Sequence, residues 1–389
     1  MQTQLRQAVV VAFGRTPYCK ARKGSFAQLH PVEYGAQTLL GVLARVPQLR
    51  PEDIGDVIMG CAMPFGVQGG NMARLIVQRA GLPDCVTAQT VNRYCSSGLQ
   101  TIATAANAIR CGEEDVVIAG GVESMSLVPM LVGAEDADPW LAEHRPEVYT
   151  TMGITAENVA RQWGISRADM DAMAVESHRR AAQAQAGGCF DGQIIPITVP
   201  GPDGGEVVVC RDEGIRPGTT AETLAGLKPC FLENGSVTAA TSSQMTDGAG
   251  FVVLMSEEKA AELGVKPLAR FVSFATGGVP AEVMGVGPIE AVPKALRKTG
   301  LTLEQMDTIE LNEAFASQAL AVIRTLGMDP ARVNPWGGAM ALGHPLGATG
   351  GRILTTLVHG MKRTRTRYGI ATLCMGGGQG GATLLELAD

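Results

Sequence analysis

Two cysteines and one histidine in glycine-rich segments are the residues of this sequence best suited to covalent chemistry. Cys95 stands in the segment Asn-Arg-Tyr-Cys-Ser-Ser-Gly at 92–98 and directly precedes a stretch with helical spacing, 99–110. The N–H groups and dipole at a helix N-terminus stabilise a thiolate, so this position predicts a lowered pKa for the Cys95 thiol. An isolated cysteine is more often buried and inert, so the assignment depends on partners elsewhere in the chain.

His344 and Cys374 are the candidate partners. His344 lies in Gly-Gly-Ala-Met-Ala-Leu-Gly-His-Pro-Leu-Gly-Ala-Thr-Gly at 337–350, where small neighbours would let it take a proton from a nearby thiol. Cys374 begins Cys-Met-Gly-Gly-Gly-Gln-Gly-Gly at 374–381, whose backbone N–H groups could stabilise an oxyanion. The same run fits Gly-x-Gly-x-x-Gly, but a strand-like stretch at 382–385 follows instead of a helix, so we reject a dinucleotide site.

Two further polar residues have both a functional and an ordinary interpretation. Asn312 follows the strand-like stretch 308–311 and could hold a water or an oxyanion, or could serve as a turn residue or helix cap. Ser243 lies in Thr-Ser-Ser-Gln-Met-Thr-Asp-Gly at 241–248, which could equally be a solvated loop.

Short apolar runs alternate with helical stretches, which predicts α/β layers with sheets covered on both faces. The predicted buried strands are 9–11, 57–59, 116–119, 252–254 and 370–373. Helices are predicted at 99–110 and 354–361. The middle third, about 123–240, is richer in Pro, Gly and charge, and is predicted to be an insertion with one amphipathic helix at about 166–186. Ser166 with Asp169 resembles a capping arrangement, and two glycines at 187–188 would end this helix.

A faint internal repeat relates the two ends of the chain. The Cys95 segment comes 39 residues after Asp56, which opens one strand, and His344 comes 37 residues after Asp307, which opens another. In both halves a small-residue helix follows, and then a strand that ends in glycines. If the halves pack about a pseudo-two-fold axis, Cys95 and His344 lie at equivalent turns that face one another.

Composition narrows the class of protein. A chain of 389 residues exceeds what one hydrophobic core usually supports, so at least two packed units are expected. A net charge of −6 argues against a nucleic-acid-binding face, and no apolar run is long enough for a membrane span. The nine cysteines form no Cys-x-x-Cys pair, so no metal site is expected, and their scatter together with the polar start of the chain favours a cytoplasmic protein.

Taken together, these segments resemble the thiolase family. The Cys95 segment, Asn-Glu-Ala-Phe at 312–315, Gly-His-Pro at 343–345 and Cys-x-Gly at 374–376 occur in the family's order, and the resemblance covers essentially the whole chain. It implies a five-layer α-β-α-β-α thiolase fold of two similar halves with an inserted loop domain. The implied boundaries are 1–122 with 245–270 for the N-terminal half, 123–244 for the inserted, CoA-binding loop domain, and 271–389 for the C-terminal half.

The resemblance also implies an activity, the thiolytic cleavage of 3-oxoacyl-CoA in fatty-acid β-oxidation. By the family's roles, His344 activates Cys95, and Cys95 attacks the ketone. Cys374 exchanges a proton with the acetyl-CoA enolate. Asn312, through a water, and His344 would hold the enolate oxygen, while the N–H groups of Cys95 and Gly376 would hold the tetrahedral oxyanion. The family implies a homodimer or homotetramer that binds CoA and 3-oxoacyl-CoA as substrates, with no metal or other cofactor.

For the substrate, the resemblance places Arg216 near the adenine end of CoA and Ser243 near the pantetheine amides. Met152 and Met284 would line the acyl tunnel, and Phe315 is assigned to the same substrate site. Thr151 stands where short-chain biosynthetic members typically have histidine, which favours the degradative branch over an acetoacetyl-CoA thiolase. Two alternatives remain: a ketosynthase-type enzyme, which uses His or Asn in place of Cys374, and a non-catalytic acyl-CoA or lipid carrier, which would not need all three reactive side chains.

Overall fold

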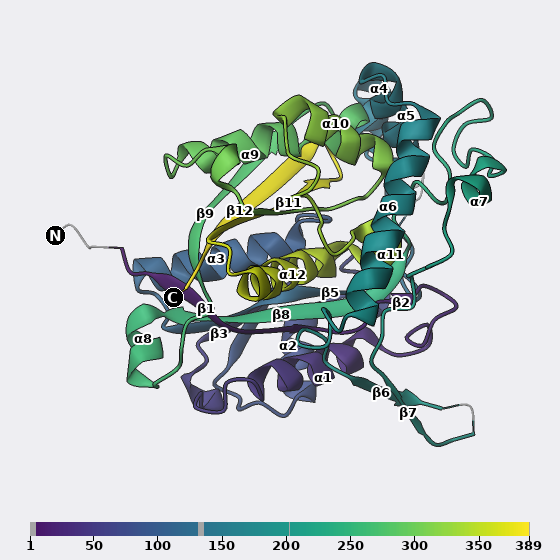
Figure 1. Ribbon diagram of the computed structural model, residues 1–389. Helices are drawn as coiled ribbons and strands as arrows, with labels where there is room; N and C mark the ends of the chain where they lie inside the picture. Colours follow the sequence, from purple (N-terminus) through teal and green to yellow (C-terminus); the bar gives the residue numbers. More distant parts are fainter. Residues whose placement is uncertain (1–4, 131–135, 202, 389) are drawn as a thin grey trace.

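A computed structural model describes residues 5–130, 136–201 and 203–388 (Figure 1). Its main sheet begins with five strands from the first two thirds of the chain: β1 (Ala8–Arg15), β3 (Asp56–Gly60), β4 (Thr87–Val91), β5 (Val116–Glu123) and β8 (Thr246–Ser256). They lie in the order β1-β8-β5-β3-β4, and the short β2 (Cys19–Lys20) pairs with β8. β3 is parallel to β4 and β5, whereas β8 is antiparallel to β5 and β1.

The last third of the chain repeats this pattern. Its strands are β9 (Ala269–Gly278), β10 (Thr308–Leu311), β11 (Tyr368–Met375) and β12 (Gln379–Leu387). The order is β9-β12-β11-β10, with β12 antiparallel to both neighbours and β11 parallel to β10. A parallel bridge from Ile309 to Val333 takes the place of the β3–β4 pairing. The match of order and direction confirms the predicted repeat.

Helices complete five alternating layers. The outer face of the N-terminal half carries α1 (Pro31–Leu43) and α2 (Met72–Arg79), and that of the C-terminal half carries α9 (Pro288–Arg297) and α10 (Ala316–Leu326). The central layer holds α3 (Ser97–Cys111) and α12 (Thr349–Thr364), which contact each other and strands of both halves (Figure 1). Pairing between β1 and β9 links the halves through only two residue pairs, so these central helices provide most of the connection.

The layers confirm the predicted α-β-α-β-α thiolase fold. Each predicted strand lies inside an observed one, and both predicted helices are present, with α12 beginning five residues earlier than the helical spacing indicated. The extra turn of α12 is rich in glycine and is buried on every side, so it shows no apolar-polar alternation.

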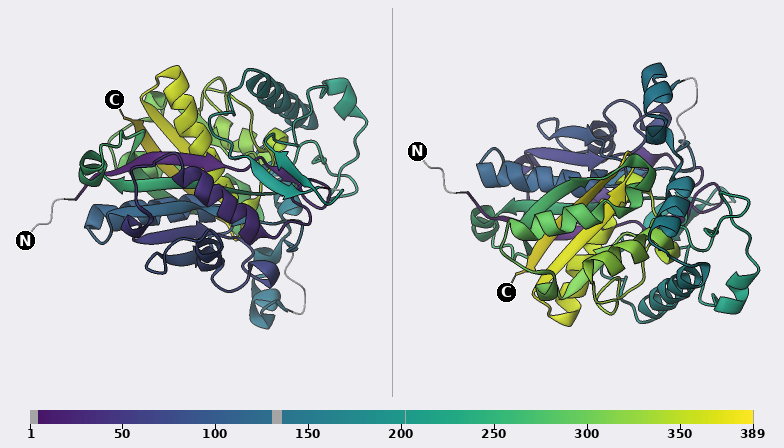
Figure 2. Two further views of the ribbon diagram at one scale, coloured as in Figure 1. Left: turned by 90° about the horizontal axis from the view of Figure 1, so that it is seen from below. Right: turned by 90° about the horizontal axis from the view of Figure 1, so that it is seen from above.

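The chain between β5 and β8 forms a separate group of elements at the end of the molecule opposite the two termini (Figure 2). They are α4 (Pro139–His144), α5 (Met152–Gln162), α6 (Arg167–Ala186), α7 (Ala221–Ala225) and the hairpin β6 (Ile197–Pro200) to β7 (Glu206–Val209). The predicted capping box of α6 is present, because the side chains of Ser166 and Asp169 each accept the other's backbone N–H. The helix ends at Ala186, with Gly187 as its C-cap. The remaining helices are α8 (Glu257–Glu262) and α11 (Ala339–Leu342).

Candidate active site

A tight turn holds Cys95 at the entrance to α3. The Asn92 side chain accepts the Tyr94 N–H at 2.8 Å, and the Ser97 hydroxyl donates to the Tyr94 carbonyl at 2.6 Å. The same hydroxyl accepts the Arg93 N–H at 2.8 Å. Tyr94 has a φ of 47°, a left-handed conformation that is uncommon for a bulky residue and that places the next residue, Cys95, out of line with the helix. The sequence motif therefore encodes a fixed position for the sulfur.

The turns that carry Cys95 and His344 meet backbone to backbone. A Cβ on Gly98 would lie 2.6 Å from the carbonyl oxygen of Gly347, and a Cβ on Gly350 would lie 2.0 Å from the Leu99 nitrogen. Contacts this close are possible only without side chains. The two turns therefore face one another, as the internal repeat predicts, and the high glycine content has a structural cause here.

Glu123, which sequence reasoning did not select, lies buried beneath both turns. Its carboxylate accepts the N–H groups of Ala62 and Gly347, both at 2.8 Å, and the Gln68 amide at 2.8 Å. Because β5 ends at Glu123 and Gly347 belongs to the His344 turn, this one side chain ties the two halves together. No local pattern marks it in the sequence, since its partners come from three separate segments.

His344 is buried and neutral. Its backbone N–H donates to the Gln244 carbonyl at 3.0 Å, and its Nδ1 lies 2.6 Å from the Thr349 hydroxyl oxygen. Burial, and after it the positive charge of Arg352, lower the pKa of the imidazole to about 3. The Asn312 side-chain nitrogen lies 3.5 Å from both ring nitrogens, and the Asn312 side-chain oxygen is buried without a partner among the described residues. A neutral imidazole beside an unsatisfied amide can accept a proton and can also donate to a substrate oxygen.

The expectation that the Cys95 thiol has a lowered pKa is wrong. Burial raises its pKa to about 12, outweighing hydrogen bonds from the Gly376 N–H and its own N–H, which favour the thiolate. Burial and the nearby Cys95 also raise the pKa of Cys374 well above its usual range. The helix N-terminus does not offset this cost of burial, although Cys95 is only partly buried. Both shifts favour the protonated thiol. The two sulfurs are close enough to interact electrostatically, and the Gly376 N–H is directed at the Cys95 sulfur.

Three of the predicted substrate residues lie in one apolar cluster with Cys374. Met284 and Phe315 are buried in this cluster, and Met152 packs against it. The Phe315 ring makes an edge-on contact with Phe231 of the inserted segment, with ring centroids 6.0 Å apart. These three residues therefore lie in the apolar wall next to Cys374. Both the C-terminal half and the inserted segment contribute side chains to this wall.

The two predicted CoA contacts are placed differently. The backbone N–H of Ser243 donates to the Ala314 carbonyl at 2.9 Å, which fixes Ser243 beside the Asn312 segment. Arg216 is exposed outside the apolar cluster, and its backbone N–H donates to Nδ1 of His178 at 3.1 Å. Arg216 therefore differs from the other predicted substrate residues, since its side chain is exposed to solvent.

A second buried carboxylate supports the His344 loop. Glu313 accepts the Ser177 hydroxyl at 2.6 Å, the Asn334 amide at 2.9 Å and the Met340 N–H at 3.2 Å. Glu313 thereby anchors α11, which leads directly into Gly343 and His344. Its place directly after Asn312 was a possible signal, but nothing in the sequence indicates its partners.

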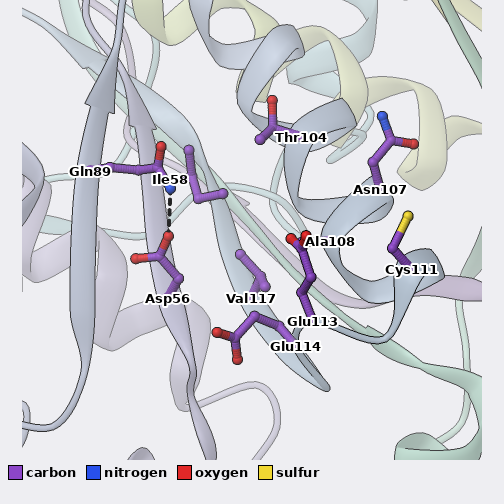
Figure 3. Close-up of a pocket in the computed structure, with 10 residues that line it drawn as sticks. All are labelled: Asp56, Ile58, Gln89, Thr104, Asn107, Ala108, Cys111, Glu113, Glu114 and Val117. Atoms are coloured by element: carbon purple, nitrogen blue, oxygen red, sulfur yellow. Dashed lines mark hydrogen bonds between the residues drawn. The ribbon is translucent and has the colours of Figure 1, made fainter.

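An open pocket elsewhere in the molecule is not the substrate site. Figure 3 shows it between β3, β4 and the last turns of α3, lined by side chains that include Asp56, Glu113 and Glu114. The α3 residues that line it begin at Thr104, about 10 Å along the helix axis from Ser97, and continue to Cys111 at the end away from Cys95. The three carboxylates would repel the phosphates of CoA, and nearby like charges together with burial raise the pKa of Glu114.

Comparisons with known proteins agree with this combination of a two-halved α/β fold and a cysteine–histidine–cysteine site. The family model for the thiolase N-terminal domain matches residues 8–258, and the model for the thiolase C-terminal domain matches residues 265–387. The chain therefore belongs to the thiolase family of acyltransferases.

Individual relatives cover the whole chain. A 3-ketoacyl-CoA thiolase of Bacillus subtilis is 51% identical over 391 residues, covering 98% of this chain and 100% of the relative. The peroxisomal 3-ketoacyl-CoA thiolase A of Mus musculus is 45% identical, covering 99% and 92%. Among solved structures, the Bacillus anthracis acetyl-CoA acetyltransferase matches with a TM-score of 0.93 and 40% identity, covering 99% of this chain and 100% of that chain.

The described residues form neither a membrane-spanning helix nor a metal-binding cluster. Among residues 5–130, 136–201 and 203–388, no helix is both long and apolar enough to cross a bilayer. Within the same part of the chain, no group of three or more His, Cys, Asp or Glu side chains is arranged to hold a metal ion.

Proposed function

We propose that this protein cleaves 3-oxoacyl-CoA thioesters with CoA, giving acetyl-CoA and an acyl-CoA shortened by two carbons, as in fatty-acid β-oxidation. The observation that carries the proposal is the meeting of Cys95, His344, Asn312 and Cys374 where the two halves touch, beside an apolar wall. The similarity to 3-ketoacyl-CoA thiolases supports this substrate class.

The first half of the proposed reaction acylates Cys95. A thiol with a pKa of about 12 is a poor nucleophile at neutral pH, so it must lose its proton as it attacks, and the neutral His344 is the base that takes that proton. The Cys95 sulfur bonds to the 3-oxo carbon, and the bond between the second and third carbons then breaks. Its electron pair leaves as the enolate of acetyl-CoA, held by His344 and by a water on Asn312. Cys374 then protonates the second carbon, and acetyl-CoA departs.

The second half transfers the acyl group to CoA. The proton of the incoming CoA thiol returns to the Cys374 thiolate, and the CoA sulfur attacks the thioester carbon on Cys95. The N–H groups of Cys95 and Gly376 hold the tetrahedral oxyanion, and a single donor of this kind contributes about 2.7–4 kcal/mol. Collapse of the intermediate expels the Cys95 thiolate, which recovers its proton from His344. Cys95, His344 and Cys374 are then in the same protonation states as before the reaction.

We further propose that residues 123–244 act as the CoA-binding domain, between the N-terminal half, 1–122 with 245–270, and the C-terminal half, 271–389. Arg216 would face the adenine end of CoA, and Ser243 the pantetheine amides. Met152, Met284 and Phe315 would line the acyl site. A homodimer or homotetramer is the expected form. The expected location is the cytoplasm, in keeping with the bacterial origin of one relative, although the mouse relative is peroxisomal.

Mass spectrometry after incubation with acetoacetyl-CoA tests the proposal. The wild-type protein should carry one acetyl group on Cys95 and should consume acetoacetyl-CoA when CoA is added. The Cys95→Ala variant should show neither. Acylation of another cysteine would refute the assignment. Synthesis of acetoacetyl-CoA from acetyl-CoA is the second candidate function, favoured by the match to an acetyl-CoA acetyltransferase, and activity on four-carbon substrate alone would support it.

A further inference from the structure

We propose that Thr349 is a positioning residue for His344, whose hydroxyl oxygen accepts the Nδ1–H of the imidazole and so keeps the lone pair of the ring on Nε2, where it takes the Cys95 proton. The inference rests on the proposed function, because it assigns His344 the role of base. The observation behind it is the 2.6 Å contact between the Thr349 hydroxyl oxygen and Nδ1 of His344, both of which are buried.

The Thr349 hydroxyl has His344 as its one hydrogen-bond partner among the described residues. Thr349 is the first residue of α12 and is fully buried. A neutral imidazole carries one proton, and it acts as a base through the nitrogen that has none. The Thr349 hydroxyl oxygen lies beside Nδ1, so the ring proton sits on Nδ1 and is donated to that oxygen. The lone pair is then on Nε2, the nitrogen that Thr349 leaves free.

Proton transfer from Cys95 leaves this hydrogen bond in place. The proton adds to Nε2 and makes both ring nitrogens donors, while the Thr349 hydroxyl oxygen still accepts from Nδ1–H. The hydrogen bond is stronger with the charged ring than with the neutral one, so it stabilises the imidazolium at the moment when the Cys95 thiolate forms.

Charged groups around the ring make this support necessary. On α12, the positive charge of Arg352 opposes a positive charge on His344. Glu310 on β10 pairs with Arg352, and the guanidinium nitrogen and carboxylate oxygen lie 3.9 Å apart. From the N-terminal half, Glu123 reaches the His344 turn only through the Gly347 N–H. Among these groups none contacts the ring directly, whereas Thr349 does.

Replacing Thr349 by Val removes the hydroxyl and keeps the shape of the side chain. Removal of a hydrogen bond to a charged group predicts a loss in kcat of about ten- to a hundredfold, with KM changed by less than about twofold. Thr349→Ser should restore kcat to within about threefold of wild type. Thr355→Val is the matched control, since Thr355 lies buried on the same helix and its hydroxyl has no partner among the described residues. The control should behave as wild type.

Alkylation of Cys95 by iodoacetamide gives a second measurement that needs no substrate. Thr349→Val should slow alkylation at pH 7 by about tenfold or more, because the imidazolium that accompanies the thiolate loses its hydrogen bond. The difference from wild type should shrink toward pH 10, where hydroxide removes the thiol proton directly. If Thr349→Val does not fold, Thr349→Ala against Thr349→Ser provides the same comparison.

Two results would overturn the proposal. One is a wild-type kcat and a wild-type alkylation profile in the variants without the hydroxyl. The other is an equal loss in the Ser and Val variants, which would show a purely structural role. A chain that lacks thiolase activity but still shows the alkylation difference would refute the proposed function and leave the positioning role standing.

Discussion

Replacing Gly98 by Ala tests whether the contact between the two halves sets the geometry of the active site. Gly98 lies in the first turn of α3, three residues after Cys95. The added Cβ would meet the Gly347 carbonyl oxygen at 2.6 Å, about 0.8 Å closer than the 3.4 Å at which ordinary contact begins. The oxygen belongs to the backbone and cannot swing aside as a flexible side chain could, and the Glu123 carboxylate holds this turn through the Gly347 N–H.

The expected effect is larger on catalysis than on stability. Overpacking of this kind costs about 1–3 kcal/mol, and alanine regains about 1 kcal/mol over glycine in a helix, so the free energy of unfolding should fall by no more than about 2 kcal/mol. Relieving the clash moves the Cys95 turn and the His344 turn apart by up to about 0.8 Å. A misplacement of about 1 Å can lower a rate by about a hundredfold, so kcat should fall by about ten- to a hundredfold.

Thiolysis of acetoacetyl-CoA and unfolding in urea measure the two effects. Gly226→Ala is the control, since Gly226 has an ordinary backbone conformation and a Cβ there would meet no atom within 4 Å. The control should keep wild-type kcat and stability. If Gly98→Ala matches wild type in both measurements, the two turns are not held in contact as described, and the reasoning fails.

Three other predictions follow from the site. Cys374→Ser leaves a hydroxyl that is a far weaker acid than a thiol, so exchange of the acetyl-CoA methyl hydrogens with D2O should fall by at least about a hundredfold while Cys95 is still acylated; exchange at the wild-type rate would disprove the role. Along a series of 3-oxoacyl-CoA substrates, kcat/KM should rise from four to eight carbons, because each buried methylene contributes about 0.8 kcal/mol; activity on acetoacetyl-CoA alone would contradict this. Burial lowers the pKa of His344 to about 3 and that of His178 to about 4, below the unfolded value of about 6.5, so protons bind the unfolded chain more tightly. The free energy of unfolding should therefore fall as the pH drops below about 6.5, by about 2 kcal/mol per histidine at pH 5, and His178→Asn should make this fall smaller in urea titrations.

Much of the architecture was determined by local sequence. Short apolar runs predict the buried strands. The capping box of α6 depends only on Ser166 and Asp169, which are three residues apart. The internal repeat correctly placed Cys95 and His344 on facing turns, because equivalent positions in two similar halves meet when those halves pack about a pseudo-two-fold axis. Local signals suffice in these cases because the interactions that decide them lie within a few residues, or recur at a fixed spacing.

The ionisation of the site was decided by tertiary structure alone. A helix N-terminus predicts a lowered pKa for Cys95, yet the partial burial that the packed layers impose raises that pKa to about 12. Glu123 and Thr349 showed no signal in the sequence, since their importance comes from partners such as Gly347 and His344 that folding brings to them. Desolvation and distant partners depend on the whole packed chain, so a sequence motif can name the reacting residues while only the fold sets their protonation states.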